Sequence, residues 1–428
     1  MIKNQNKHYY ILNFMAILLA ILPIALFTGP FIPDLIVVML SISFLFYCYK
    51  KKKFYFIKNL FSVLFIIFVS FLVLRSIFAQ NPIFSLKTSL FYVRFGFFVL
   101  SILLILRYYK DASKFLYKTL YFSTFFVSFD VIFQYIFGYN LFGIVNKDPS
   151  RITGIFGSEA IVGSYLVRLV PLTLFLYFIS KKYEKKTNFF LITILLIFAD
   201  IAILLSGERA SFFLLILHLL FLFFFSKKFF IFRFFSLSVS IIFISIILWN
   251  SSLVKERMFV STFAELKVIN ESKSTAENNS NRFFFYSKNH NAHFQTAYKM
   301  YLDNKLFGQG PNMFRILCSD SKYNFNESSC STHPHNHYLQ ILSEIGLVGL
   351  SFVIFIIYFL ISKLFRSIKK KIIRTNDNLM VSKKILLSIF FMTLWPFITT
   401  GNFFNNWLNI IYFFPIPFYI HNFVKHKL

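Results

Sequence analysis

Long apolar runs restrict the possible folds of this chain more than any other feature. Each run has about 16 to 24 residues, the length that a helix needs to cross a hydrocarbon core about 30 Å thick. Only helices and closed barrels satisfy their backbone hydrogen bonds inside a bilayer. Twelve runs occur, near residues 9–27, 32–49, 56–74, 89–106, 114–137, 160–179, 188–205, 210–225, 229–249, 338–361, 385–400 and 404–421. We therefore expect an all-α integral membrane protein with about twelve transmembrane helices.

Composition and charge agree with a membrane protein. Of the 428 residues, 57% are hydrophobic and only 14% are charged, whereas a soluble domain has roughly 25% charged residues. The formal net charge of +28 would suggest nucleic acid binding in a soluble chain. Here, however, the basic residues lie mainly in alternate connections, such as Lys50–Lys53 and Lys181–Lys186, as the positive-inside rule predicts. This sorting predicts that both termini are cytoplasmic, and we expect no nucleic acid partner.

A long polar segment separates the ninth and tenth runs and divides the chain into three parts. Residues 1–249 are predicted to form helices one to nine, 250–337 a large and partly helical loop, and 338–428 the last three helices. The charge pattern places this loop outside the cytoplasm, which is the periplasm in a Gram-negative bacterium. Within the loop, residues 265–281 are polar and without periodicity, so we expect loose order there.

The three cysteines bear on redox chemistry and on metal binding. Cys318 and Cys330 both lie in the long loop, whereas Cys48 lies at the cytoplasmic end of a predicted span. In an oxidising compartment the two loop cysteines are expected to form a disulfide. The alternative is a zinc site in which both thiolates join two of the histidines 290, 293, 333, 335 and 337. Zinc ligands usually pair two to five residues apart, so the cysteine spacing fits poorly and no metal is expected.

Arginines in or next to the predicted spans are the second unusual feature. Arg209 follows Glu208 in a very short connection, SGERA, between the seventh and eighth runs. The pair can close a tight helical hairpin, or Arg209 can bind an anion, because guanidinium contacts phosphate oxygens in a bidentate manner. Arg94 and Arg168 lie within spans and Arg151 in an external connection. Arg94 and Arg168 can each extend toward the membrane surface on their own, but together the arginines match a polyanionic lipid headgroup.

Histidines 333, 335 and 337 lie directly before the tenth run, in HPHNHYLQILSEIGLVGL. Pro334 favours an extended His333 and a helix that starts near Asn336, whose side chain can cap the first turn. Together with LLSGERAS and FGQGPNMF, this segment, with its pattern His-Asn-x-x-Leu and a later Gly346, resembles the O-antigen ligase and polymerase superfamily of bacterial membrane proteins.

The resemblance implies a fold, a reaction and a set of site residues. Its members have about twelve helices, with one large periplasmic loop between the ninth and tenth. They transfer a glycan from undecaprenyl pyrophosphate to an acceptor hydroxyl at the periplasmic face of the inner membrane, without a metal or another cofactor. The essential histidine of the family corresponds to His335 and its short-loop arginine to Arg209. A further loop arginine corresponds to Arg282, although HNAHFQTA, with His290 and His293, replaces the usual arginine pattern.

These residues suggest a mechanism. His335 takes the acceptor proton while arginines stabilise the leaving diphosphate, and the anomeric carbon is inverted by in-line attack. The predicted substrate-binding residues are Arg282, Arg168, Arg94, Arg151, Asn336 and His293.

The acceptor is lipid A-core in a ligase and a growing glycan in a polymerase, and a protein-glycosylating relative is also compatible. A transporter is the alternative from another class, but its polar residues should lie near mid-membrane in repeated halves. Nothing in the sequence predicts an oligomeric state.

Overall fold

The computed structural model describes residues 3–109, 111–180, 189–264, 288–369 and 377–423. Within these ranges the regular elements are helices, apart from a single bridge between Tyr139 and Val145. The first part of the chain contains α1 (Lys3–Ala25), α2 (Phe31–Lys51), η1 (Phe54–Ile57), α3 (Leu60–Ile77), α4 (Pro82–Tyr108), α5 (Ala112–Phe137), η2 (Gly154–Phe156), α6 (Val162–Ser180), α7 (Phe189–Leu205), α8 (Arg209–Phe225) and α9 (Lys227–Asn250). The remainder contains α10 (Ser252–Lys255), η3 (Glu256–Val260), α12 (Lys288–Asp303), α13 (Phe314–Leu317), η4 (Glu327–Ser329), α14 (His337–Lys369), α15 (Asp377–Thr393), α16 (Asn406–Phe413) and α17 (Pro415–Phe423).

The predicted all-helical architecture is confirmed for the described residues, and each apolar run contains helix. By length and composition, seven of the described helical segments can cross a membrane, namely Phe31–Lys51, Leu60–Ile77, Pro82–Tyr108, Ala112–Phe137, Val162–Ser180, Phe229–Asn250 and His337–Phe359. Tyr10–Ala25, Phe189–Leu205 and Arg209–Phe225 are apolar but shorter. The total of twelve spans therefore stays a prediction.

Two of the predicted runs differ from the helices that form. The run 385–400 does not stay helical, because α15 ends at Thr393 and residues 394–405 form a connection without regular helix. Pro396 explains this end, since proline removes a backbone donor and disfavours helix at the residue before it. The last run is divided between α16 and α17, and Pro415 begins the second of these helices.

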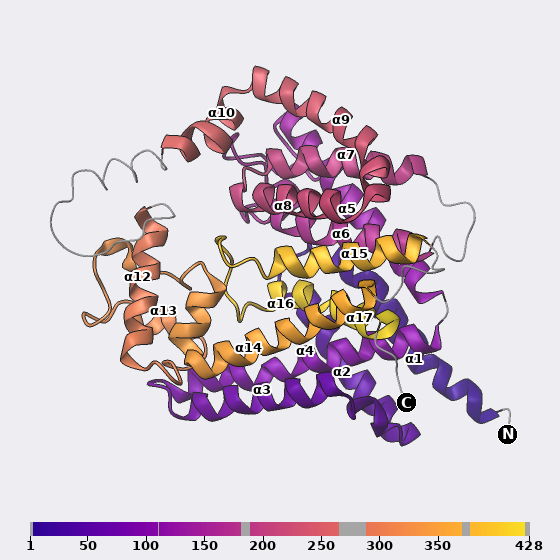
Figure 1. Cartoon of the computed structure of the whole chain (residues 1–428), viewed down its shortest axis with the longest axis vertical. Coiled ribbons are helices and arrows are strands. Elements are labelled where there is room, and N and C mark those ends of the chain that lie inside the picture. Colours follow the sequence, from indigo (N-terminus) through magenta and orange to yellow (C-terminus); the bar gives the residue numbers. More distant parts are fainter. Residues whose placement is uncertain (1–2, 110, 181–188, 265–287, 370–376, 424–428) are drawn as a thin grey trace.

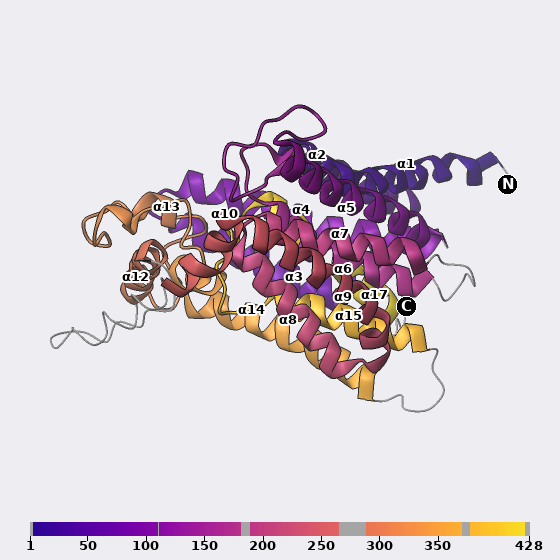
Figure 2. The same ribbon diagram turned by 90° about the horizontal axis from the view of Figure 1, so that it is seen from above.

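The helices run side by side, and several of the short elements lie at one end (Figures 1 and 2). Helices α10, α12 and α13 lie at this end, which we call the head end, and both chain ends lie toward the opposite end. Helix α6 is buried along almost its whole length, whereas α9 exposes most of its surface. The centre of the bundle is thus α6, which packs against α5, α7, α8 and α15.

Helix α14 is interrupted at Gly346, where the backbone takes φ 65° and ψ −167°. The break lies against the turn that follows α12, because Leu347 N donates to Lys305 O at 2.9 Å and Gly310 N donates to Glu344 O at 2.7 Å. A Cβ on Gly346 would lie 2.3 Å from Leu306 O, closer than any side-chain carbon can approach. The glycine of the sequence pattern is therefore required for this close backbone packing.

The head end has a small core of its own. It buries Ala79, Ala297, Met300, Met313, Phe314, Leu317, Cys318 and Tyr323. Cys318 and Cys330 form a disulfide at its edge, with 4.9 Å between their Cα atoms. The disulfide ends directly before the histidine segment and restricts how far that segment can move.

Candidate functional site

Four histidine rings meet at the head end, and we call them the histidine cluster: His290, His293, His333 and His335. His290 and His293 come from the first turns of α12, whereas His333 and His335 precede α14. The ring centroid of His335 lies 4.1 Å from that of His333, 5.1 Å from that of His290 and 5.2 Å from that of His293. His335 is therefore the central member of the cluster.

The backbone at His335 is held in an unusual conformation. Its φ is +57°, in the left-handed region that few residues other than glycine adopt. Thr400 fixes this geometry, because its N–H donates to His335 O at 2.9 Å and its carbonyl oxygen lies 3.2 Å from His333 Nε2. Such strain persists where the surroundings impose it, and it is common at functional sites. Residues 394–405 are thus part of the site.

Asn336 positions the start of α14. Its Oδ1 accepts the N–H groups of Tyr338 and Leu339 at 3.0 and 3.1 Å, so the predicted capping of the first turn is confirmed. Its Nδ2 donates to Pro396 O at 2.9 Å. Because both ends of the amide are engaged with the chain, Asn336 joins the histidine segment to residues 394–405.

Burial controls the charge of the histidine cluster. It lowers the pKa of His335 to about 3 and that of His333 to about 4, and for His335 the neighbouring imidazoles lower the pKa further. The pKa of His293 is also lowered, first by burial and then by His290. These three rings are therefore neutral at pH 7, and His335 can accept a proton or a hydrogen bond.

The short connection between α7 and α8 organises a second group of residues. Glu208 does not simply close a hairpin with its neighbour, since its carboxylate accepts Gly163 N at 2.6 Å and Ser164 N at 3.0 Å. It thereby caps the start of α6, where a negative charge is favourable. Burial raises the pKa of Glu208. Arg209 donates from Nε to Arg257 O at 3.0 Å.

Three arginines surround this connection, and we call Arg151, Arg209 and Arg257 the arginine cluster. Arg257 Nε donates to Gly207 O at 3.0 Å, and a Cβ on Gly207 would lie 2.9 Å from Arg151 Cγ. Arg257 is not among the site residues predicted from the sequence. It follows the end of α9 by seven residues, and a basic residue so close to the end of a predicted span is a signal by which it could have been found.

The two clusters lie at the same end of the bundle (Figure 1). Phe213 lies one turn beyond Arg209 on α8, and its ring centroid is 6.4 Å from that of Trp395. Trp395 adjoins Pro396, whose carbonyl binds Asn336. A continuous series of contacts therefore connects the arginine cluster to the histidine segment through residues 394–405.

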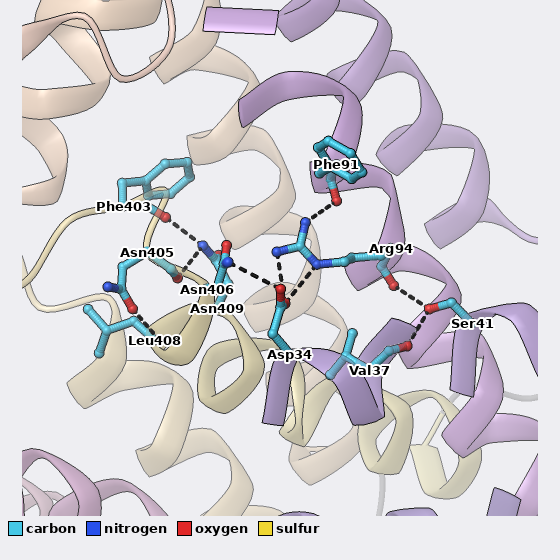
Figure 3. Close-up of polar contacts among 10 residues, drawn as sticks. All are labelled: Asp34, Val37, Ser41, Phe91, Arg94, Phe403, Asn405, Asn406, Leu408 and Asn409. Atoms are coloured by element: carbon cyan, nitrogen blue, oxygen red, sulfur yellow. Dashed lines mark hydrogen bonds and ion pairs between the residues drawn. The ribbon is translucent and has the colours of Figure 1, made fainter. Parts of the chain in front are cut away.

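The remaining predicted arginines are placed differently. Arg94 forms an ion pair with Asp34 at 2.9 Å and also donates to Phe91 O, as Figure 3 shows. Arg168 is buried in α6 and donates to Ser164 O at 3.0 Å. Arg282 lies outside the described residues. Within the described part of the chain, no group of three or more His, Cys, Asp or Glu side chains is arranged to hold a metal ion.

Comparison with known proteins agrees with the resemblance noted from the sequence. The model of the family described as O-Antigen ligase matches residues 191–354, a range that contains Arg209, Arg257, the histidine cluster and Gly346. No curated protein matches the chain. The family supports an O-antigen ligase or polymerase type of activity in general. The match over residues 191–354 supports a relation of this multi-pass membrane protein to the O-antigen ligase and polymerase superfamily.

Proposed function

We propose that the protein is an inverting, metal-independent glycosyltransferase of the O-antigen ligase type. It transfers a glycan from undecaprenyl pyrophosphate to an acceptor hydroxyl of lipid A-core, at the periplasmic face of the inner membrane. The observation that carries the proposal is His335, which is neutral, central among four imidazoles and held in a left-handed backbone conformation. It lies in the family-matched region, at the same end of the bundle as the arginine cluster.

His335 acts on the acceptor hydroxyl. A neutral imidazole has the lone pair that a general base needs, whereas a protonated one does not. A pKa of about 3 makes a weak base, but the negative charge of a bound pyrophosphate favours the protonated imidazole and raises its pKa. The base therefore gains strength when the donor is present. In this proposal His293 and His333 pack beside His335 and fix the orientation of its ring.

The arginine cluster stabilises the leaving undecaprenyl diphosphate. Bond cleavage leaves the electron pair of the anomeric C–O bond on the phosphate oxygen, and guanidinium groups are suited to hold that charge. Arg209, Arg151 and the newly recognised Arg257 take this role, with Arg282 a further contributor from the long loop. Arg94 contributes indirectly, because its charge is already compensated by Asp34. Asn336 positions the histidine segment rather than the sugar, since its amide is engaged with the chain.

The test is glycan transfer by the purified full-length protein with undecaprenyl-pyrophosphate glycan as donor. Lipid A-core and a second donor glycan are supplied as separate acceptors, and the product identifies a ligase or a polymerase. We expect His335→Ala to reduce turnover by a factor of about 10² to 10⁴, the usual contribution of a general base. Arg209→Ala should reduce turnover by about 10²-fold or more, which is the usual cost of losing one group that stabilises charge in the transition state.

Lys322→Ala is the matched control. It removes an exposed ion pair with Asp303 at the head end, away from both clusters, and should keep wild-type turnover. Full turnover in His335→Ala would exclude the proposed mechanism. Transport of the lipid-linked glycan across vesicles without any transfer product would favour the transporter alternative.

A further inference from the structure

The buried arginines differ in how their charge is compensated. Four arginines of the described residues are at least nine-tenths buried: Arg75, Arg94, Arg168 and Arg233. Arg94 and Arg233 pair with the carboxylates of Asp34 and Asp200, at 2.9 and 2.6 Å. Arg75 donates from Nε to the carbonyl oxygens of Phe307 and Gly308, each at 3.0 Å. The first two are ion pairs, and the third supports a backbone turn.

Arg168 has no comparable compensation. Its side chain donates to Ser164 O, one turn earlier in its own helix, and Nη2 lies 3.5 Å from Tyr412 Oη. Its Nε is buried without a hydrogen-bond partner. Among the described residues, no carboxylate forms an ion pair with it. Glu208 is one turn away, but its oxygens accept N–H groups from the start of α6.

A second unpartnered polar atom lies beside Arg168. The His337 ring centroid is 5.4 Å from that of Tyr412, and the Arg168 guanidinium carbon is 5.5 Å from the same centroid. His337 Nε2 is buried without a hydrogen-bond partner. His337, Tyr412 and Arg168 belong to α14, α16 and α6, so polar side chains from three separate helices converge here.

This arrangement is costly unless an anion completes it. A guanidinium keeps its charge when buried, and an unpaired charge within a membrane protein destabilises the folded state. We propose that Arg168, His337 and Tyr412 form a binding site for a phosphate group carried by a prenyl lipid. The identity of that lipid rests on the proposed function. Arg168 follows Val162 by six residues, so it lies about 9 Å along α6 from the end that Glu208 caps. This depth suits the phosphate nearest the prenyl chain.

The experiment measures binding rather than catalysis. Farnesyl pyrophosphate is titrated into the purified full-length protein in nanodiscs, and the melting temperature is measured without ligand. We expect Arg168→Gln to weaken binding at least tenfold. Because the substitution removes an uncompensated charge, the unliganded variant should melt at the wild-type temperature or above. Arg168→Lys keeps the charge and should retain most of the affinity.

Arg75→Gln is the matched control, since it also truncates a buried arginine but removes only bonds to carbonyl groups. It should lower the melting temperature and leave the affinity within twofold. If Arg168→Gln behaves like Arg75→Gln, Arg168 is structural and the proposal is wrong. Wild-type affinity in Arg168→Gln overturns it equally.

Two further ligands identify the source of the phosphate. Farnesol should bind without any dependence on Arg168, and inorganic pyrophosphate should bind more weakly than farnesyl pyrophosphate. Equal, Arg168-dependent binding of inorganic pyrophosphate would overturn the lipid assignment in favour of a soluble anion. The binding result does not depend on the transfer assay. If the protein proved not to transfer glycan, it would still bind the anion through Arg168. Conversely, failure of the binding test leaves the role of His335 untouched.

Discussion

At the scale of single residues, the histidine cluster couples the stability of the protein to pH. His293, His333 and His335 have folded-state pKa values below the unfolded value of about 6.5. The unfolded chain therefore binds more protons than the native state as the pH falls below 6.5. Their contribution to stability is fully present above pH 6.5, and it is lost progressively as the pH falls toward 4 and 3.

We therefore expect the melting temperature to be nearly constant between pH 8 and 7 and to fall between pH 6.5 and 5. Glu208, whose pKa burial raises, acts in the opposite direction as the pH falls, so the histidine contribution is measured by comparing the wild type with a histidine variant. The double variant His293→Asn/His333→Asn removes two of the three imidazoles named above and should show a smaller fall over the same interval. An equal fall in the variant and the wild type would contradict the assignment.

The sequence predicted the members of the site better than their contacts. His335 and Arg209 follow from a local pattern and from a charge in a short connection, both visible in the linear chain. The approach of His290 and His293 to His335 depends on how α12 packs against α14, which no spacing encodes. The sequence predicts Arg94 as a substrate ligand together with the other arginines, whereas its ion-pair partner Asp34 lies 60 positions away in the chain. A basic residue in a span does not indicate where its counter-charge lies.

At the scale of elements, the break in α14 determines where His335 lies. Gly346→Ala places a Cβ 2.3 Å from Leu306 O and also imposes a left-handed conformation on alanine. Gly138→Ala is the control, because Gly138 has φ +80° but nothing within 4 Å of an added Cβ. The control should lose about 1 kcal/mol from backbone strain alone. Gly346→Ala should lose distinctly more stability, and glycan transfer as well.

Thermal unfolding and transfer assays of both variants distinguish these effects. Similar losses in the two variants would mean that α14 can relax around the added methyl group.

Hydropathy could not predict this break, because LSEIGLVGL reads as a continuous apolar helix. The same limitation explains the run 385–400, where apolar residues fold into the connection that holds Asn336 and His335. Apolar composition identifies membrane-buried segments, but backbone contacts decide which of them stay helical.

At the scale of the whole molecule, the arrangement of the helices leads to a topology that can be tested. Both chain ends lie opposite the head end (Figures 1 and 2), which agrees with an even number of spans. If the basic connections are cytoplasmic, exposed residues near Lys52 face the cytoplasm and those near Glu327 face the periplasm. Single cysteines at these exposed positions report the side directly, since Cys48 is buried and the other two cysteines form a disulfide.

In spheroplasts treated with a membrane-impermeant maleimide, we expect Glu327→Cys to be labelled and Lys52→Cys to be labelled only after permeabilisation. Tyr139→Cys, at an exposed position after α5, should behave like Glu327→Cys because α5 ends at the side opposite the start of α3. The wild-type protein, whose thiols are buried or oxidised, measures the background. Labelling of Lys52→Cys in intact spheroplasts would invert the topology. It would also place the histidine and arginine clusters in the cytoplasm, where a periplasmic acceptor is inaccessible, so the proposed transfer reaction depends on this result.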